Sequence, residues 1–397
     1  MHILYLHQHF ATRAGTWGTR SYELSRLLIE QGHQITMLCG WSDRSGLPYD
    51  PDQRVMEHEI DGIRVLALNV PYSQNMSYLR RIWAFVWFML LAAGVALRQR
   101  KVDVIFATST PLTIAVPAMI ASVINHKPFV FEARDLWPDI PIGMGILRNP
   151  VLKFAARALE WVTYRRARHI VACSPGMKAG IVEKGIQPEK VTVIPNASDN
   201  DLFDVPPEVG QAFRAEHPNL GDGPLVVYTG TFGRVNHLEY LVKLAQHVRQ
   251  IDPQIRFLLV GTGSEKPKIR ALAKELGVLD DNLWIMDAVP RQEMPAILSA
   301  ASLATSTVIQ NPVLFHNSAN KFFDALASGT PIAINHEGWQ ADLLREENAG
   351  LVLAGDDFEG ATSTLVDAVH DPVGLDAMGK AAQRLARERF DRNKLAL

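Results

Sequence analysis

Short apolar runs alternate along the chain with longer segments whose apolar residues recur at helical spacing. In the first half the apolar runs are residues 3–6, 35–38, 102–106, 129–131, 169–172 and 191–194. In the second half they are residues 225–228, 256–260, 283–286, 303–306 and 332–334. Short, β-branched runs separated by helical segments are typical of parallel strands that are covered on both faces. The pattern therefore predicts an α/β protein built from doubly wound, Rossmann-like sheets.

The length of the chain predicts more than one such sheet. At 397 residues it is too long for one small core, and two domains are expected. Residues 204–208, Asp-Val-Pro-Pro-Glu, resemble a linker, so we predict a first domain over 1–203 and a second over 204–379. Two such domains would face each other across a cleft lined by strand-end loops, where ligands of these folds bind.

Composition narrows the function classes only a little. The apolar fraction of 47% is ordinary for a globular protein, and a net charge of -2 gives no general case for binding nucleic acid. Cys39 and Cys173 are the two cysteines and form no CxxC spacing, so neither a zinc site nor a disulfide framework is expected. The N-terminus leads directly into a strand without the pattern of a signal peptide, which favours the cytoplasm.

A ligand site fits the start of a helix predicted within residues 318–334. Lys321, Asp324 and Ser328 are three and four residues apart and share one helix face, and Gly329 ends the helix. The helix N-terminus and Lys321 would attract a phosphate, while Asp324 would accept hydrogen bonds from sugar hydroxyls. A surface salt bridge on an ordinary amphipathic helix is the alternative.

A glycine-containing loop follows the first predicted strand. Gly15 and Gly18 would let the backbone approach a phosphate closely, and Arg20 would add positive charge. The spacing matches neither GxGxxG nor a P-loop, so a plain strand-to-helix turn is equally compatible with it.

Charged residues also gather directly after the run 129–131. Glu132, Arg134, Asp135 and Asp139 lie in one short segment with Trp137, which offers a surface for stacking a sugar. The carboxyl end of a parallel strand is where ligands bind in such sheets. A structural network of salt bridges is the alternative.

Residues 82–97 carry no charge and are flanked by arginines and Lys101. The run is shorter than the ~20 residues that a spanning helix needs. A buried helix of the domain and a helix that lies in a membrane interface both fit, the latter because of the tryptophans and the basic flanks over 80–101. A membrane span fits less well.

Taken together, these motifs resemble glycosyltransferase family 4, whose members have the two-Rossmann-domain (GT-B) architecture. Within it the chain is similar to bacterial sugar transferases of surface polysaccharide assembly, such as those of O-antigen or capsule. The resemblance covers nearly the whole chain and depends on the order of several motifs. These are residues 15–20, 133–139, 173–177, 193–196, 257–263 and 321–331.

The resemblance implies transfer of a hexosyl or N-acetylhexosaminyl group from a nucleotide diphosphate sugar, with retention at the anomeric carbon. No metal or cofactor is expected, because basic side chains and helix N-termini stabilise the leaving diphosphate in this family. We expect a UDP-sugar as donor, a lipid-linked or oligosaccharide acceptor, and a location at the inner face of the cell membrane. Such a reaction needs stabilisation of the charge on the leaving group and close positioning of the acceptor.

Roles carry over from the family residue by residue. Asp135 takes the position of a catalytic or orienting group, with Glu132 as the second candidate. The expected donor-binding residues are Gly15, Gly18, Arg20, Gly230, Thr231, Arg234, Gly261, Gly263, Ala288, Val289, His316, Ser318, Asn320, Lys321 and Asp324.

The chain departs from the family pattern at several of these positions. Where the family commonly has two glutamates eight residues apart, the chain has His316 and Asp324, and a histidine is no substitute for a carboxylate at neutral pH. Thr231 and Asn236 stand where many members have an arginine and a lysine, so we expect Arg234 and Lys321 to supply the charge.

The resemblance also predicts that a C-terminal helix, about 380–397, packs back on the first domain. Two other functions fit the same architecture. A sugar-nucleotide 2-epimerase would change its donor without any acceptor, by acid-base chemistry. A non-catalytic nucleotide-sugar-binding protein would bind a donor without turnover.

Overall fold

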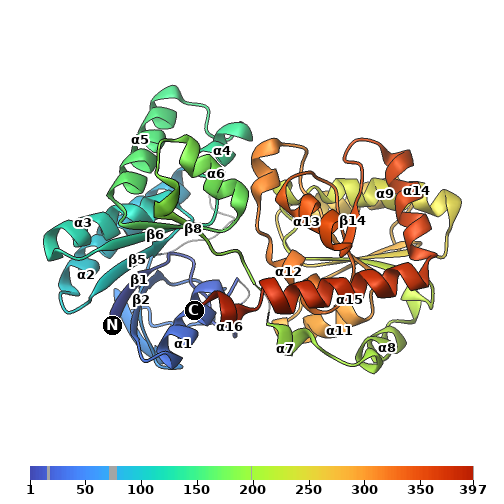
Figure 1. Ribbon diagram of the computed structural model, residues 1–397, viewed down its shortest axis with the longest axis horizontal. Helices are drawn as coiled ribbons and strands as arrows, with labels where there is room; N and C mark the ends of the chain where they lie inside the picture. Colours follow the sequence, from blue (N-terminus) through green and yellow to red (C-terminus); the bar gives the residue numbers. More distant parts are fainter. Residues whose placement is uncertain (16–17, 71–77, 198, 397) are drawn as a thin grey trace. The chain divides into compact units, whose positions relative to one another are not determined.

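The computed structural model describes residues 1–15, 18–70, 78–197 and 199–396 (Figure 1). These residues form two compact units, one over Met1–Pro195 together with Ala396 and one over Asn196–Leu395. Each unit is a mainly parallel sheet with helices on both faces. The predicted fold class, two doubly wound α/β domains, is confirmed.

The sheet of the first unit has the order β3-β4-β2-β1-β5-β6-β7-β8. Its strands, in that order, are Val55–Ile60, Ile63–Leu68, Gln34–Gly40, His2–Leu6, Val104–Thr108, Phe129–Ala133, His169–Ala172 and Val191–Val193. All paired strands run parallel except β3 and β4. The carboxyl ends of the parallel strands therefore meet at one edge, where the predicted polar loops begin.

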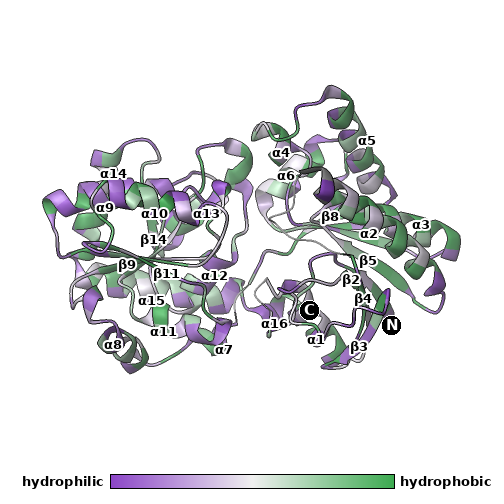
Figure 2. Ribbon diagram, turned by 180° about the vertical axis from the view of Figure 1, so that it is seen from behind, coloured by the Kyte–Doolittle hydropathy of each residue, from purple (hydrophilic) through white to green (hydrophobic). Residues whose placement is uncertain are grey.

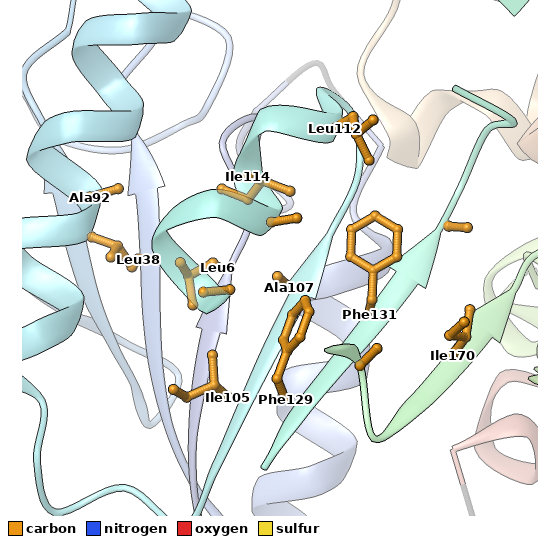
Figure 3. Close-up of a cluster of buried hydrophobic side chains, with 14 of the residues drawn as sticks. Leu6, Leu38, Ala92, Ile105, Ala107, Leu112, Ile114, Phe129, Phe131 and Ile170 are labelled. Carbon is orange, nitrogen blue, oxygen red and sulfur yellow. The ribbon is translucent and has the colours of Figure 1, made fainter. Parts of the chain in front are cut away.

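The helices of the first unit cover the two faces of this sheet. They are α1 (Arg20–Glu30), α2 (Tyr78–Arg98), α3 (Ala115–Asn125), α4 (Asp139–Gly143), α5 (Pro150–Arg166) and α6 (Pro175–Glu183), with short 3-10 helices η1 (Leu112–Ile114) and η2 (Pro188–Lys190). Helix α1 packs on one face through Tyr22. Helices α2, α3, α5 and α6 pack on the other face, where Ala92 of α2 meets Leu38 of β2 and Phe131 of β6 lies in the same layer (Figure 3).

The apolar run 82–97 forms most of helix α2. Ala84, Phe88 and Ala92 face the sheet and are buried, whereas Trp83 and Trp87 are exposed. The interpretation of α2 as a fully buried helix is therefore wrong. Among the described residues no helix combines the length and apolar character that crossing a membrane requires.

The second sheet has the order β11-β10-β9-β12-β13-β14, and all of its neighbouring strands are parallel. Its strands, in that order, are Leu283–Met286, Arg256–Val260, Leu225–Thr229, Leu303–Ser306, Ile332–Ile334 and Gly350–Val352. The central strand β9 is wholly buried and places Tyr228 in the core. The carboxyl ends of β9 and β10 again meet at one edge of the sheet.

The helices of the second unit also lie on two faces. They are α7 (Asn200–Phe203), α8 (Pro207–Glu216), α9 (Leu238–Ile251), α10 (Lys266–Glu275), α11 (Met294–Ser299), α12 (Asn320–Ala327), α13 (Trp339–Glu347), α14 (Phe358–Val369), α15 (Pro372–Arg389) and α16 (Arg392–Leu395), with 3-10 helices η3 (Pro218–Leu220), η4 (Arg234–Asn236), η5 (Arg291–Glu293) and η6 (Pro312–His316). Helices α9, α10 and α14 share one core with the sheet. Helices α12, α13 and α15 share another.

Two predicted boundaries differ from the structure. The first unit ends at Pro195 instead of residue 203, because Phe203 is buried in the core formed with α12 and α15. The expected packing of residues 380–397 on the first domain is wrong for the described part of that segment up to residue 395. Leu385 and Phe390 belong to the core of the second unit, and the Phe390 ring lies 5.0 Å from that of Phe323 on α12.

Candidate functional site

Two glycine turns from neighbouring strands lie against each other in the second unit. Gly230 follows β9 and Gly261 follows β10, and the Gly230 amide donates a hydrogen bond to the Val260 carbonyl over 2.9 Å. Both glycines have positive φ angles, 140° and 151°. A Cβ atom on Gly261 would lie 1.8 Å from the Gly230 carbonyl oxygen, so a side chain does not fit there. Close backbone approach at these strand ends thus depends on glycine.

Lys321 reaches from the first turn of α12 to these turns. Its Nζ donates hydrogen bonds to Tyr228 Oη at 2.8 Å and to Asn236 Oδ1 at 3.2 Å, and it lies 4.3 Å from the centre of the Tyr228 ring. A Cβ atom on Gly230 would lie 3.0 Å from Lys321 Cε. The glycine turn and the lysine stem are therefore in direct contact, as expected from the sequence.

The charge of Lys321 is not balanced within the described chain. Its printed partners are a hydroxyl, an amide oxygen and an aromatic ring, and among the described residues no carboxylate pairs with it. Burial lowers the pKa of Lys321 to about 7. A buried amine that lacks an anion is a ready partner for a negatively charged ligand.

The N-terminus of α12 adds to this positive potential. Helix α12 begins at Asn320, and Ala319 caps it without any side-chain hydrogen bond. The first turn has no acidic residue, so nothing offsets the positive end of the helix dipole. The expected donor-binding residues Asn320 and Lys321 thus lie together at an anion-attracting helix end.

Asp324, by contrast, is already engaged. Its two carboxylate oxygens accept hydrogen bonds from Arg291, over 3.2 and 3.0 Å. The guanidinium of Arg291 also lies 5.2 Å from the centre of the Phe203 ring. The expected contact of Asp324 with sugar hydroxyls is therefore replaced by a partly buried ion pair that ties α12 to η5.

The segment before α12 has mostly structural contacts. Ser318 Oγ accepts a hydrogen bond from the Asn196 amide over 3.1 Å, and the Ser318 carbonyl accepts one from Asn196 Nδ2 over 2.5 Å. These bonds hold the chain that enters the second unit instead of leaving the Ser318 hydroxyl for the donor. His316 ends η6 and is half-buried.

The loop after Gly230 borders a small cavity. The Thr231 carbonyl accepts hydrogen bonds from Tyr228 Oη and Asn236 Nδ2, each over 2.8 Å, so Thr231 contributes backbone to the site. Arg234 is exposed and, with His237 and Lys268, lines a cavity of about 270 Å³. Arg234 is thus a second cation close to the glycine turns.

The turn after β10 is fixed by another lysine. Lys266 Nζ donates to the carbonyls of Gly261 and Met286, each over 2.9 Å, and so joins the ends of β10 and β11. A Cβ atom on Gly263 would lie 2.4 Å from the Phe232 carbonyl oxygen. The expected base-side residues Ala288 and Val289 follow β11, with Ala288 exposed and Val289 half-buried.

At the strand ends of the first unit the charges are paired. Arg20 Nε and Nη2 donate to Glu132 Oε1 over 3.0 and 2.8 Å, and Thr108 Oγ1 donates to Glu132 Oε2 over 2.6 Å. Arg20 also donates to the carbonyls of Ile194 and Pro195. Although burial acts to raise it, the pKa of Glu132 is lowered, because Arg20 lies beside it. These contacts give Arg20 and Glu132 a supporting position, not the donor-binding and catalytic roles expected for them.

Asp135 stands apart from that network. Burial raises its pKa to about 6, partly offset by the neighbouring Arg134. Among the described residues its carboxylate has no hydrogen-bond partner, and Arg134 Nη1 lies 3.4 Å from His7 Nε2. Burial, together with Arg134, also lowers the pKa of His9 to about 4. Asp135 is therefore a carboxylate beside neutral histidines at the carboxyl end of β6.

The glycine loop of the first unit is only partly described, because residues 16 and 17 lie outside the described chain. A Cβ atom on Gly15 would lie 2.5 Å from the Arg44 carbonyl oxygen, so packing within the unit already explains this glycine. Gly18 is half-buried. The expected contact of this loop with donor phosphate stays a prediction.

Sequence reasoning missed Tyr228 and Arg291, which hold Lys321 and Asp324. Tyr228 lies inside an apolar strand and Arg291 lies 33 residues before its partner, so no local pattern indicates either contact. Within the described residues no group of three or more His, Cys, Asp or Glu side chains is arranged to hold a metal ion.

Comparison with known proteins identifies the fold units. Residues 15–197 match the family described as Glycosyl transferase 4-like domain, and residues 223–371 match Glycosyl transferases group 1. The chain belongs to glycosyltransferase family 4. This confirms the resemblance drawn from the sequence motifs and the enzyme class, a glycosyltransferase.

Curated relatives of this family 4 glycosyltransferase are distant. The chain is 23% identical over 64% of its length to the GDP-mannose-dependent alpha-(1-6)-phosphatidylinositol monomannoside mannosyltransferase of Mycolicibacterium smegmatis. It is 24% identical over 100% of its length to the MMP alpha-(1->4)-mannosyltransferase of Mycolicibacterium hassiacum, of which it covers 96%. The alignments span only 63% and 60% of the mannosyltransferase from M. smegmatis and of an Arabidopsis thaliana N-acetylglucosaminyltransferase subunit.

Solved structures show the same GT-B fold. Sucrose-phosphate synthase from Thermosynechococcus elongatus has a TM-score of 0.79 at 18% identity, with 100% of this chain and 96% of that chain covered. Anabaena HepE in complex with UDP and glucose has a TM-score of 0.72 at 18% identity, with coverage of 100% and 97%. WaaG, a glycosyltransferase involved in lipopolysaccharide biosynthesis, has a TM-score of 0.70 at 14% identity, with coverage of 99% and 97%.

Proposed function

We propose that the chain is a retaining, metal-independent glycosyltransferase. It moves a sugar from a UDP-sugar to a hydroxyl of a lipid-linked saccharide during cell-surface polysaccharide biosynthesis. The observation that carries the proposal is Lys321, a buried amine that contacts the Gly230 turn and has no carboxylate partner among the described residues. A nucleoside diphosphate supplies the negative charge that this site lacks.

The donor diphosphate would occupy the space bounded by Lys321, the N-terminus of α12 and the Gly230 turn. Transfer leaves negative charge on the departing phosphate, and preorganised donors aimed at that charge lower the barrier. Lys321 supplies one cation, Arg234 a second, and the amides at the start of α12 the positive end of a dipole. In this proposal these groups do the work that a metal ion does in other transferases.

UDP is favoured over GDP because Anabaena HepE, which shares the fold, has been solved with UDP and with UDP-glucose. The relative from M. smegmatis is GDP-mannose-dependent, so GDP is the competing donor nucleotide. The two nucleotides share the diphosphate that Lys321 would bind and differ in the base, which would lie near Ala288 and Val289.

Asp135 is proposed to orient the acceptor hydroxyl and to accept its proton. It lies directly after β6, where ligands bind in parallel sheets, and its carboxylate has no hydrogen-bond partner among the described residues. Its pKa of about 6 suits a group that is ionised at neutral pH yet able to take up a proton. Glu132 is unsuited to that task because Arg20 and Thr108 already occupy its oxygens.

The acceptor is proposed to be lipid-linked, with the enzyme peripheral at the inner membrane face. The exposed Trp83 and Trp87 of α2 support this, since tryptophan is enriched at membrane interfaces. The titles of two similar proteins, a phosphatidylinositol monomannoside mannosyltransferase and WaaG in lipopolysaccharide biosynthesis, point to acceptors of the same kind.

A thermal-shift panel of UDP, GDP, ADP and CDP tests the donor site. At about a hundredfold excess over its Kd, a ligand stabilises the folded state by about 2.7 kcal/mol. We expect a shift with UDP that is lost in Lys321→Met, which removes the charge and keeps the apolar stem. A shift with GDP alone would replace UDP as donor, and no shift with any nucleotide would contradict the proposal.

A further inference from the structure

Helix α2 carries an apolar stripe on its outer side as well as on its inner side. Trp83, Trp87 and Leu90 follow one another at helical spacing and are exposed, with Trp83 71% exposed. The inner stripe through Phe88 already packs against the sheet. The outer stripe therefore has no role in the core of the first unit.

The same outward apolar character continues over the neighbouring helices. Helix α2 packs beside α3, and α3 beside α5, on one face of the first sheet (Figures 1 and 2). Helix α3 exposes Val123 and Ile124, and α5 exposes Phe154, which is 76% exposed, together with Trp161. Exposed apolar patches of this kind mark interaction surfaces. We call this surface, formed by the exposed residues of α2, α3 and α5, the three-helix face.

The charges on the three-helix face have one sign. Helices α2 and α3 contain no aspartate or glutamate, and the one acidic residue of α5, Glu160, is buried beside Lys184. The exposed charged residues of these helices are all basic, namely Arg80, Arg98, Arg157, Arg165 and Arg166. Apolar and cationic side chains are thus interleaved without any exposed carboxylate.

We propose that the three-helix face lies on a bilayer that contains anionic lipid. Tryptophan and aliphatic side chains enter the boundary of the acyl region, and the arginines contact anionic headgroups. A second copy of the chain fits less well, because a two-fold contact through this face would bring the arginines of both copies together. The inference deepens the proposed function by naming the surface that brings the enzyme to a lipid-linked acceptor.

Vesicle flotation tests the inference. Wild-type protein is incubated with phosphatidylcholine vesicles and with vesicles that also contain phosphatidylglycerol. We expect binding to the second kind, weakened by salt. In Arg157→Gln/Arg166→Gln the partition coefficient should fall about fivefold for each charge removed. In Trp83→Ser/Phe154→Ser it should fall about tenfold or more on both lipid mixtures.

Matched controls use exposed residues of the second unit. Val373→Ser removes an apolar side chain that is 78% exposed, and Arg270→Gln/Lys274→Gln removes two exposed charges from α10. Both should bind vesicles as the wild type does, and circular dichroism should show all variants folded. Equal binding by folded face variants and controls would overturn the inference, as would binding to an acidic protein but to neither kind of vesicle. UDP binding is measured in parallel, so a failed donor site is distinguished from a failed membrane surface.

Discussion

The two units treat charge at their strand ends in opposite ways. In the first unit Arg20 and Glu132 are buried together, and Thr108 and two backbone carbonyls complete their hydrogen bonds. In the second unit Lys321 is buried against a phenol, an amide and a glycine turn, with no carboxylate among the described residues. A paired charge supports the fold, whereas an unpaired one is prepared for a ligand.

The largest expected effect is on the paired charge. Glu132→Gln leaves the guanidinium of Arg20 buried without a counter-charge, and breaking such a pair costs about 3 kcal/mol or more. Urea unfolding should show this loss in the transition that reports on the first unit. Lys321→Met is the contrasting variant and should lose no stability. If both variants are equally stable, the two sites do not differ as described.

The next effect concerns ligand affinity. Lys321→Met removes a charged donor from the proposed diphosphate site, and hydrogen bonds to charged groups contribute about 1.5–3 kcal/mol. UDP affinity should therefore fall about 10- to 100-fold in calorimetric titration. Lys274→Met, on the exposed surface of α10, serves as the control and should bind UDP as the wild type does. A larger loss of affinity in the control would contradict the assignment.

The stability of the second unit should depend on pH through the same lysine. Burial lowers the folded-state pKa of Lys321 to about 7, while the unfolded chain keeps the ordinary value near 10.4. Between these values the unfolded state binds more protons, so this group makes the folded state more stable as pH rises. Thermal melts across that window should show the rise in the wild type, and Lys321→Met should lack it.

The smallest effect is expected at the partly exposed pair of Asp324 and Arg291. Asp324→Asn keeps the shape of the side chain and removes its charge, which should cost about 1 kcal/mol in unfolding experiments. UDP affinity should change little, because the Asp324 carboxylate faces Arg291. Loss of UDP binding without loss of stability would restore the sugar-binding role predicted from the sequence.

Most strands were predictable because they are short apolar runs, and the helix that carries Lys321 was predictable from its spacing. Strand β3 was missed because it is an antiparallel strand at the edge of the sheet whose exposed Glu57 interrupts any apolar run. The pairing of Arg20 with Glu132 joins residues 112 positions apart, and no local pattern indicates such a contact. The boundary near Phe203 was misplaced because a proline-rich segment signals a turn, whereas burial decides which core a residue joins.

The most direct test of the unpaired lysine is proton uptake on nucleotide binding. UDP is titrated calorimetrically about one pH unit above the pKa of Lys321, in buffers of different ionisation enthalpy. Because the diphosphate favours the charged amine, the wild type should take up close to one proton on binding, and Lys321→Met should take up none. Tight binding with no proton uptake, unchanged in Lys321→Met, would contradict the account.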